Sequence, residues 1–334
     1  MKNKNILVTG GLGFIGSHFI ELLHRNCENC KITILDSYAY CVSKKTEDYL
    51  WDMYKSSSNE LDIVYECISN FKLDKEYNYI INFAAESHVD NSIKAGDVFI
   101  NSNYVGIYEL LKQVPSKTRF LQVSTDEVYG SLQFNSQPSE EYDTLDPSSI
   151  YSATKAGADL LALSFNRTYQ KDIIITRCTN NFGPRQFPEK FIPVVINKIL
   201  NNKKIPVYGN GSNMRQWIYV KDHCEKLFNV LRFGKAGEIY NLAPDYESEY
   251  SNLEIVKSIL SELNASESLI SYVEDRKGHD LRYSLRDSGY RTMMMQLAAQ
   301  LSLPGTEKTF ADDLRYTIMW YKENNEWWSK QSNN

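Results

Sequence analysis

Short apolar runs rich in Ile, Val and Leu alternate with longer amphipathic stretches over the first half of the chain. The runs are continuous rather than alternating, and they fall at 5–10, 31–37, 79–85, 120–126 and 173–179. Strands of a parallel sheet that is covered on both faces have this pattern, and the helical stretches between them supply the crossovers. The pattern therefore predicts an α/β fold built on a doubly wound parallel sheet.

The regular alternation stops after about residue 184, at the Pro-rich stretch GPRQFPEKFIPVV. Beyond it, periodicity predicts further elements: a helix at 188–201, a short strand at 205–209, and helices near 251–263 and 310–323. We expect residues 1–184 to form the domain that contains the main sheet. We expect residues 185–334 to form mainly a smaller C-terminal α/β domain, with segments near 216–245 returning to the first.

Composition limits the classes of protein that need to be considered. The chain has 334 residues, of which 42% are hydrophobic and 24% charged, as in soluble globular proteins. No stretch approaches the roughly 18 apolar residues of a membrane span, and the N-terminus leads directly into the first apolar run rather than into a signal peptide. We expect a cytoplasmic protein. A net charge of −5 argues against nucleic-acid or membrane partners.

The six cysteines are scattered through the chain, and such thiols are typical of a reducing compartment. The close pair Cys27 and Cys30 has no second pair or histidines at the spacing of metal ligands. We therefore expect no metal site.

Three glycines, Gly10, Gly13 and Gly16, lie between the first predicted strand and the first predicted helix. At such a turn glycine allows backbone amides to approach a pyrophosphate, and the helix N-terminus adds partial positive charge. Asp36 ends the next predicted strand, about twenty residues later, where an acid accepts hydrogen bonds from an adenosine ribose. Because a carboxylate there repels a 2′-phosphate, the pattern predicts a Rossmann-type site for NAD rather than NADP.

Tyr151 and Lys155 are four residues apart and therefore lie on one face of a predicted helix. A phenol with an ordinary pKa near ~10 is a poor base at neutral pH, and a nearby ammonium and a positive nicotinamide ring can lower that pKa. Together with the glycine turn and the Ser124–Thr125 strand end, this pair predicts alcohol oxidation by NAD. In these features the sequence resembles the extended branch of the short-chain dehydrogenase/reductase superfamily.

Two neighbouring acids, Asp126 and Glu127, follow the fourth of these apolar runs. Like charges held close together resist ionising at the same time. Alcohol oxidation gives such a pair no task, whereas a dehydration needs one group to remove a proton beside a carbonyl and another to protonate a departing hydroxyl. The pair therefore favours a dehydration.

Several longer motifs make the resemblance specific: STDEVYG, FAAESHVDNSI, YSATKAGAD, NNFGPRQFPEKFIP, PVYGNGSNMRQWIYVKDH, DRKGHDLRY and TIMWYKENNEWW. They resemble motifs of the nucleotide-sugar 4,6-dehydratases, known for dTDP-glucose and UDP-glucose, along nearly the whole chain. The resemblance implies NAD as cofactor, a homodimer formed through helices near 98–113 and 151–169, and a nucleotide-linked 4-keto-6-deoxy-glucose as product, on the way to 6-deoxyhexoses of the rhamnose type.

The resemblance also implies catalytic roles. Tyr151, assisted by Lys155, would remove the proton of the sugar 4-hydroxyl while the C4 hydride passes to NAD. Glu127 would take the C5 proton, Asp126 would protonate the departing 6-hydroxyl, and the hydride would return to C6. Thr125 would hydrogen-bond near the 4-hydroxyl.

Binding residues are implied in the same way. For NAD they are Gly10, Gly13, Phe14, Ile15, Gly16, Asp36, Cys67, Ile68, Phe83, Ala84, Ala85, Asn103, Val123, Tyr151, Lys155 and Cys178. For the nucleotide sugar they are Ser87, Asn181, Glu189, Lys190, Arg215, Asn252, Arg276 and His279. Arginine suits a diphosphate because its planar fork donates paired hydrogen bonds. Purely structural interpretations stay open for three of them: a surface ion pair for Arg215, a helix N-cap for Asn252 and a turn for His279.

Two stretches depart from the family pattern. Residues 66–68 are Glu-Cys-Ile in place of the usual Gly-Asp-Ile, which implies that adenine is contacted by the backbone or by Glu66. Residues 285–309 match no expected motif and receive no assignment.

Two other functions fit part of the pattern. A nucleotide-sugar 4-epimerase shares the fold, NAD and the tyrosine–lysine pair but has no task for Asp126 and Glu127, and a non-catalytic nucleotide-sugar or NAD-binding protein needs none of the four residues. The nucleotide base is also open, because uracil and thymine differ by one methyl, worth about 1–3 kcal/mol in a pocket. LDSYAYC and SATKAGA resemble the UDP-glucose enzymes, and RKGHDLRY resembles the dTDP-glucose enzymes, so the balance of these stretches favours UDP-glucose.

Overall fold

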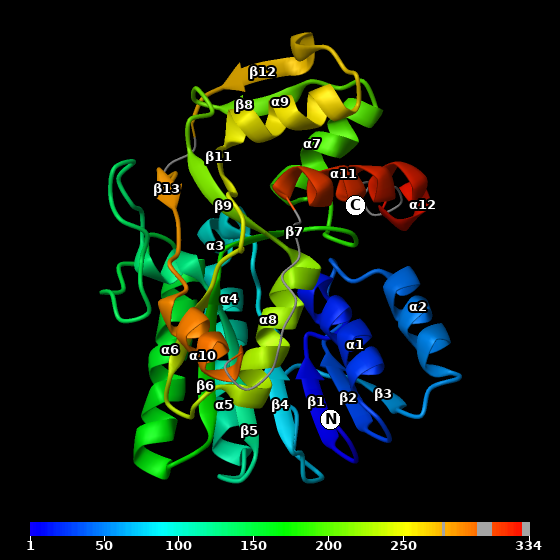
Figure 1. Cartoon of the computed structure of the whole chain (residues 1–334), viewed down its shortest axis with the longest axis vertical. Helices are drawn as coiled ribbons and strands as arrows, with labels where there is room; N and C mark the ends of the chain where they lie inside the picture. Colours follow the sequence, from blue (N-terminus) through cyan, green and yellow to red (C-terminus); the bar gives the residue numbers. More distant parts are fainter. Residues whose placement is uncertain (276–277, 299–308, 329–334) are drawn as a thin grey trace.

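A sheet of parallel strands forms the larger part of the molecule in the computed structural model, which describes residues 1–275, 278–298 and 309–328 (Figure 1). Within these residues the sheet has seven strands in the order β10-β6-β5-β4-β1-β2-β3. The strands are β1 (Asn5–Thr9), β2 (Lys31–Asp36), β3 (Glu60–Tyr65), β4 (Tyr79–Asn82), β5 (Arg119–Thr125), β6 (Ile173–Cys178) and β10 (Ile239–Leu242). The predicted doubly wound α/β fold is confirmed.

Helices cover both faces of this sheet, because the side chains of successive strand residues point to opposite faces. Ile6 and Val8 of β1 pack in one hydrophobic core, and Leu7 between them packs in another. The first core is closed by α1 (Phe14–Asn26), α2 (Lys44–Tyr54) and α8 (Val220–Phe233). The second is closed by α5 (Gly106–Gln113) and α6 (Ile150–Tyr169), with the π-helical turn η1 (Ile100–Val105) packed against both helices.

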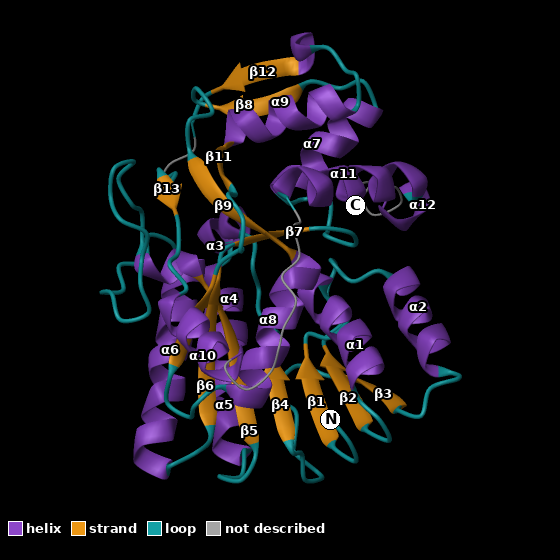
Figure 2. Cartoon of the chain, in the orientation of Figure 1, coloured by secondary structure: helices purple, strands orange, loops and turns teal. Residues whose placement is uncertain are grey.

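A smaller α/β part lies above the carboxyl ends of the large sheet in Figures 1 and 2. Its central sheet has the order β11-β9-β13, with β7 beside β9, and β8 pairs with β12. Its elements are β7 (Asn180–Phe182), α7 (Phe191–Leu200), β8 (Ile205–Tyr208), β9 (Met214–Tyr219), β11 (Glu249–Ser251), α9 (Asn252–Glu262), η3 (Glu267–Leu269), β12 (Ile270–Val273), β13 (Arg282–Tyr283), α11 (Phe310–Glu323) and α12 (Asn325–Trp328).

The chain crosses between the two parts more than once. After β9 it returns to the large sheet, where α8 packs on α1 and β10 adds an edge strand parallel to β6. Helix α10 (Ser288–Ala298) packs beside β10, so the first part of the atypical stretch 285–309 belongs to this edge of the sheet. Residues 299–308 of that stretch lie outside the described residues.

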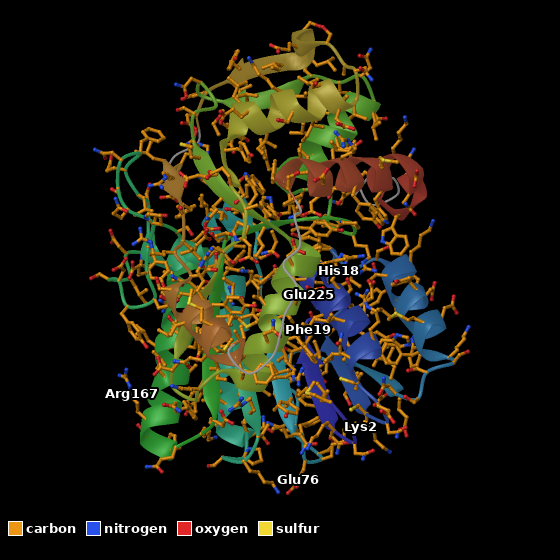
Figure 3. All side chains as sticks on the ribbon, viewed as in Figure 1. Lys2, His18, Phe19, Glu76, Arg167 and Glu225 are labelled. Atoms are coloured by element: carbon orange, nitrogen blue, oxygen red, sulfur yellow. The ribbon has the colours of Figure 1, made fainter. Side chains whose placement is uncertain are left out.

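The strand order determines where a ligand can bind. The chain order reverses between β1 and β4, and in open α/β sheets ligands bind at such a point, beyond the carboxyl ends of the strands. In Figure 3 His18 lies near this level, where the two parts meet, whereas Lys2 and Glu76 lie at the opposite end of the sheet. None of the helices in the described ranges is both long and apolar enough to cross a membrane.

Candidate active site

A cavity of about 330 Å³ lies at the carboxyl ends of the parallel strands, below the smaller part. Its walls come from the segments that follow β1, β2, β3, β4, β5 and β6 and from residues 185–190. The predicted site residues that line it are Gly10, Gly13, Phe14, Ile15, Gly16, Asp36, Cys67, Ile68, Phe83, Ala84, Ala85, Ser87, Val123, Thr125, Asp126, Glu127, Tyr151, Lys155, Cys178, Asn181, Glu189 and Lys190. The structure therefore brings most of the predicted NAD, catalytic and sugar residues to one place.

The glycine turn after β1 has the geometry that a dinucleotide site needs. Gly10 has a φ of +67°, and a Cβ there would lie 2.7 Å from the backbone nitrogen of Ala84. A Cβ on Gly16 would collide with the carbonyl oxygen of Gly10. Helix α1 begins after Gly13 with no side-chain cap and no acid in its first turn. Its first amide groups therefore remain available to a pyrophosphate at the cavity wall.

Asp36, at the end of β2, ties this turn to the neighbouring strand. Its Oδ2 accepts a hydrogen bond from the backbone nitrogen of Leu12 at 3.0 Å, and its Oδ1 accepts one from that of Tyr38 at 2.9 Å. Burial raises the pKa of its carboxyl, and these two backbone hydrogen bonds oppose the rise. The carboxyl lies in the cavity wall close to the glycine turn, so the residues present fit NAD.

Tyr151 and Lys155 enter the cavity from the first turns of α6. Ser149 caps this helix in a capping box with Ser152, which fixes where the helix starts. The Nζ of Lys155 donates to the carbonyl of Val123 on β5 at 2.7 Å, and burial lowers the pKa of the ammonium group. Burial, followed by the charge of Glu127, raises the pKa of Tyr151 well above its usual value. In the protein by itself Tyr151 is therefore a neutral phenol, and further positive charge at the site must lower its pKa.

The two acids lie on the short helical turn η2 (Asp126–Tyr129), directly after β5. Thr125 caps this turn: its hydroxyl accepts from the backbone nitrogen of Glu127 at 3.3 Å and donates to Oδ1 of Asp126 at 3.1 Å. Burial, followed by the charge of Glu127, raises the pKa of Asp126 to about 7. Asp126 is thus protonated over a range in which an ordinary aspartate is ionised, as a proton donor must be.

This pKa predicts how Asp126 affects stability. Between about pH 4 and pH 7 the folded protein binds the proton of Asp126 more tightly than the unfolded chain does, so this group makes the free energy of unfolding fall as pH rises. Replacing it by the neutral Asn removes that effect. We expect Asp126→Asn to raise the melting temperature by a few degrees at about pH 8 and to change it little at about pH 4. Thermal melts followed by circular dichroism test this, and an equal change at both pH values would contradict it.

On the sugar side of the cavity, the predicted residues Ser87, Asn181 and Lys190 are fixed by hydrogen bonds. The Nζ of Lys190 donates to the carbonyl of Ser87 at 2.7 Å, and burial lowers the pKa of its ammonium group. Asn181 donates to the carbonyl of Thr179, and its Oδ1 lies 2.8 Å from Nδ1 of His223. Burial lowers the pKa of His223 to about 3, so this imidazole is neutral and its Nδ1–H donates to Asn181.

Two predicted residues, Arg215 and Asn103, do not line the cavity but interact with residues that do. Arg215 on β9 stacks on the ring of Tyr283 at 4.7 Å, and its charge lowers the pKa of Asp126 against the effect of burial. Arg215 is buried, so the surface ion pair is the wrong interpretation. Asn103, predicted to contact NAD, accepts from the backbone nitrogen of Glu86 at 2.8 Å and donates to the carbonyl of the same residue. It positions the loop after β4.

Two further predicted substrate residues, Asn252 and His279, do not line the cavity. Asn252 is the first residue of α9, and the N-cap is Ser251, so the N-cap interpretation of Asn252 was wrong by one residue. The Nδ1 of His279 lies 2.7 Å from Oδ1 of Asp275, and the imidazole packs edge-on against Tyr208. Arg276 lies outside the described residues.

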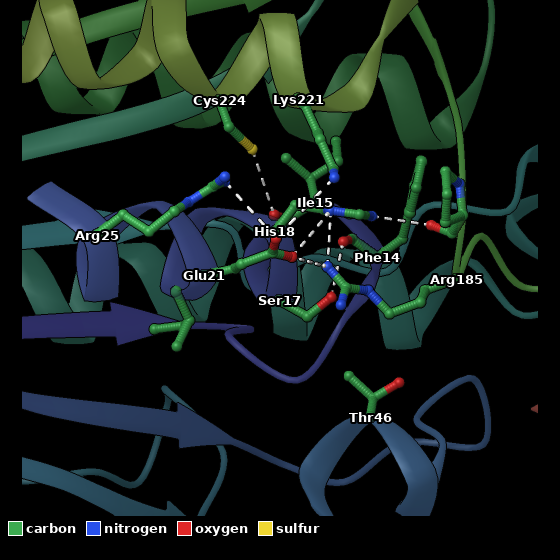
Figure 4. A network of polar contacts seen from close by, with 12 residues as sticks. Phe14, Ile15, Ser17, His18, Glu21, Arg25, Thr46, Arg185, Lys221 and Cys224 are labelled. Atoms are coloured by element: carbon green, nitrogen blue, oxygen red, sulfur yellow. Dashed lines mark hydrogen bonds and ion pairs between the residues drawn. The ribbon is translucent and has the colours of Figure 1, made fainter. Parts of the chain in front are cut away.

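Tyr40 and Arg185 are among the cavity residues that the sequence interpretation missed. Tyr40, on the loop after β2, donates to the carboxylate of Glu189, with oxygen–oxygen distances of 2.9 and 3.0 Å. Arg185 lies beside the N-terminal half of α1, where it contacts Glu21 at 2.9 Å and Nδ1 of His18 at 2.6 Å (Figure 4). Both residues fall in quoted motifs, but their partners are distant in sequence.

Residues 66–68 show how the atypical adenine segment is arranged. Oε1 of Glu66 accepts from the backbone nitrogen of Cys67 at 3.0 Å, and Glu66, Cys67 and Ile68 all line the cavity. The carboxylate of Glu66 therefore hydrogen-bonds to the backbone of this segment at position 67, where the family usually has Asp.

Comparison with known proteins agrees with this geometry. Residues 7–286 match the family described as GDP-mannose 4,6 dehydratase. The chain belongs to this family. Family membership confirms the resemblance to nucleotide-sugar 4,6-dehydratases, and the solved relatives share the fold.

Similarity extends over almost the full length of the chain. It is 40% identical over 332 residues to dTDP-glucose 4,6-dehydratase of Actinoplanes sp., covering 97% of this chain and 99% of that protein. It is 45% identical over 284 residues to the low-salt glycan biosynthesis protein Agl12 of Haloferax volcanii, covering 84% and 89%. The structure of DesIV, a dTDP-glucose 4,6-dehydratase from Streptomyces venezuelae with NAD and TYD bound, superposes with a TM-score of 0.87 at 38% identity, covering 98% and 99%.

Proposed function

We propose that this protein is a hydro-lyase that uses NAD to convert dTDP-glucose into dTDP-4-keto-6-deoxy-glucose. The observation that carries the proposal is the presence of Asp126 and Glu127 in the same cavity as Tyr151 and the glycine turn. Oxidation needs the phenol and the cofactor site, and only loss of water gives the two acids a task. The dTDP-glucose 4,6-dehydratases among the relatives, including structures with NAD bound, support it.

The amide groups of α1 and the carboxyl of Asp36 would hold NAD, which supplies a reversible hydride acceptor beside the sugar. Tyr151 takes the proton of the 4-hydroxyl, and the ammonium of Lys155 stabilises the negative charge that develops on the phenol. Thr125, whose hydroxyl caps the η2 turn, lies where it can hydrogen-bond to the 4-oxygen.

The acids complete the dehydration. Once C4 is a carbonyl, the C5 proton is acidic enough for Glu127 to remove as a general base. The proton held by Asp126 passes to the 6-hydroxyl, which leaves as water, and the resulting C5–C6 double bond would take up the hydride stored on the cofactor at C6 and the proton held by Glu127 at C5. Arg215 is buried, and its charge interacts with those of both acids. Its guanidinium contributes positive charge that holds the substrate diphosphate or the acids in place.

The two alternatives have weaker support. Solved 4-epimerases share the fold; one from Methanobrevibacter ruminantium matches with a TM-score of 0.80 at 26% identity. A 4-epimerase leaves the 6-hydroxyl in place, so buried Asp126 would have no role in it. A non-catalytic binding protein would have no reason to bury an acid whose pKa is raised to about 7.

The relatives favour dTDP-glucose, whereas two of the three informative sequence stretches resemble the UDP-glucose enzymes. Incubation of the purified protein with each sugar nucleotide tests both points. The proposal predicts a 4-keto-6-deoxy sugar, with kcat/KM higher for dTDP-glucose. Formation of the galactose isomer would favour an epimerase, no product from either would favour a binding protein, and a preference for UDP-glucose would reverse the assignment of the base.

We further propose that the protein is a homodimer. Several apolar side chains on α4 (Gly96–Phe99), η1, α5 and α6 are exposed, among them Val98, Tyr104, Tyr108 and Leu160, the last at 58%. A second copy packed on these helices would cover them. Leu160→Asp should therefore shift the protein toward monomers in analytical ultracentrifugation. Tyr272→Asp, at an equally exposed site on β12, should leave the mass unchanged, and a wild-type monomer would contradict the proposal.

We also propose that the protein is cytoplasmic. All six cysteines are free thiols, which is typical of a reducing compartment.

A further inference from the structure

A buried ion pair lies directly behind the cavity. The Nε of Arg177 on β6 donates to Oδ2 of Asp159 on α6 at 2.9 Å, and the two side chains are 2% and 0% exposed. Neither residue lines the cavity. Desolvating two charges costs so much free energy that such pairs are weak sources of stability. This cost raises the question of what else the pair does.

Asp159 lies on the same face of α6 as the two catalytic residues of that helix, four residues after Lys155 and eight after Tyr151. Its negative charge raises the pKa of Lys155 against the effect of burial. Burial raises the pKa of the Cys178 thiol, the other acidic group near Lys155, to about 12, so that thiol is neutral near pH 7. Titratable and charged groups face this region from three elements: Tyr151 and Asp159 on α6, Arg177 and Cys178 on β6, and Asp126 and Glu127 on η2.

Arg177 reaches the catalytic acids from the other direction. Its Nη1 donates to the hydroxyl of Tyr129 at 2.8 Å, and its guanidinium lies 4.8 Å from the centre of the Tyr129 ring. Tyr129 is the last residue of η2, the turn that carries Asp126 and Glu127. The Tyr129 hydroxyl in turn donates to Oδ1 of Asn241 on β10 at 2.9 Å.

We propose that Asp159 and Arg177 are positioning residues for the reaction: Asp159 keeps the side chain of Lys155 an ammonium, and Arg177, through Tyr129, holds the acid-bearing turn in place. Neither side chain touches the cavity, so both act through their neighbours. This inference rests on the proposed function for its kinetic consequences, but its effect on Lys155 is a property of the protein alone.

The first test is Asp159→Asn. Loss of the negative charge should lower the pKa of Lys155, so the ammonium is lost at lower pH. The alkaline limb of kcat against pH should move down by the same amount, with KM unchanged because the pair lies outside the cavity. NMR titration of Lys155 in protein labelled with ¹³C at the lysine ε-carbon measures the shift without turnover. A Lys155 titration and an alkaline limb identical to those of the wild type would overturn the proposal.

Two further variants make the test robust. Asp159→Glu keeps the charge and should restore the wild-type alkaline limb. Tyr129→Phe keeps the ring but removes the hydroxyl that accepts from Arg177, so kcat should fall roughly tenfold with KM and the Lys155 titration unchanged. Should Asp159→Asn fail to fold by circular dichroism, Tyr129→Phe decides the matter, and a wild-type kcat in that variant would overturn the proposal.

The matched control is Asp172→Asn, which breaks the half-exposed ion pair between Asp172 and Arg119 at the far end of β5. It should change neither the Lys155 titration nor the pH profile. If the wild type dehydrates no sugar nucleotide but Asp159→Asn still lowers the pKa of Lys155, the proposed function fails while the assignment of Asp159 stands.

Discussion

The Glu127→Gln variant should lose sugar dehydration by roughly 10²–10⁴-fold in kcat, with little change in KM. Gln keeps the size and the backbone hydrogen bond to Thr125 but cannot accept the C5 proton. Initial rates of 4-keto-6-deoxy product formation measure the effect. The amide also removes the charge of Glu127 that, together with burial, raises the pKa of Asp126, so the pH profile of the residual activity should shift to lower pH.

A control separates this result from a general loss of a carboxylate. Glu76 is exposed and pairs with Lys117 at the opposite end of the sheet, so Glu76→Gln should keep wild-type kcat. Dehydration by Glu127→Gln at the wild-type rate would remove the main reason for preferring a dehydratase over an epimerase.

Tyr151→Phe should abolish turnover to a similar extent, again roughly 10²–10⁴-fold, because no other group would take the proton of the 4-hydroxyl. The phenyl ring preserves the packing of this buried residue against Phe99, so the melting temperature should stay close to that of the wild type. Transient kinetics of C4 oxidation, followed by loss of deuterium from C4-labelled substrate, should show the defect at the first step. This distinguishes Tyr151→Phe from Glu127→Gln, which blocks a later one.

Tyr142→Phe is the matched control, since Tyr142 is exposed and hydrogen-bonds to Glu238 away from the cavity. Its kcat should equal that of the wild type. A Tyr151→Phe variant with wild-type activity would show that another base serves the reaction.

The sequence was informative where the chemistry is encoded by neighbouring residues. The glycine turn, the pair of acids and the tyrosine–lysine pair each lie within one turn or one helix, and strand ends of a parallel sheet converge at one edge. Knowing the strands was therefore enough to place Asp36 and Thr125 at a single cavity, whereas Tyr151 enters it from the first turn of α6. The roles assigned to these residues follow from the family resemblance and stay predictions until the variants are measured.

The sequence was less informative where a function depends on contacts between distant segments. Tyr40 and Glu189 are 149 residues apart and meet only because the loop after β2 lies beside the segment before α7. Asn103 bonds the backbone of Glu86, which carries no side-chain signal, and the hydroxyl of Thr154, 51 residues away. The pair of Arg177 and Asp159 joins a strand to a helix, and in sequence each looks like an isolated charge in an apolar run.

The beginning of α7 shows a smaller difference of the same kind. Periodicity predicted a helix from residue 188, and the helix begins at Phe191. Glu189 and Lys190 remain in the turn before the helix, closed by the hydrogen bond from the backbone nitrogen of Lys190 to the carbonyl of Phe187, and there Glu189 meets Tyr40 and Lys190 meets the carbonyl of Ser87. These tertiary contacts take precedence over the local helical preference.

The most direct test of the central claim is the fate of the hydrogen at C4 of the sugar. Wild-type protein given dTDP-glucose deuterated at C4 should yield a 4-keto-6-deoxy product that carries the deuterium at C6, with a solvent hydrogen at C5, as NMR of the product would show. Deuterium retained at C4, in a mixture of glucose and galactose isomers, would contradict the account.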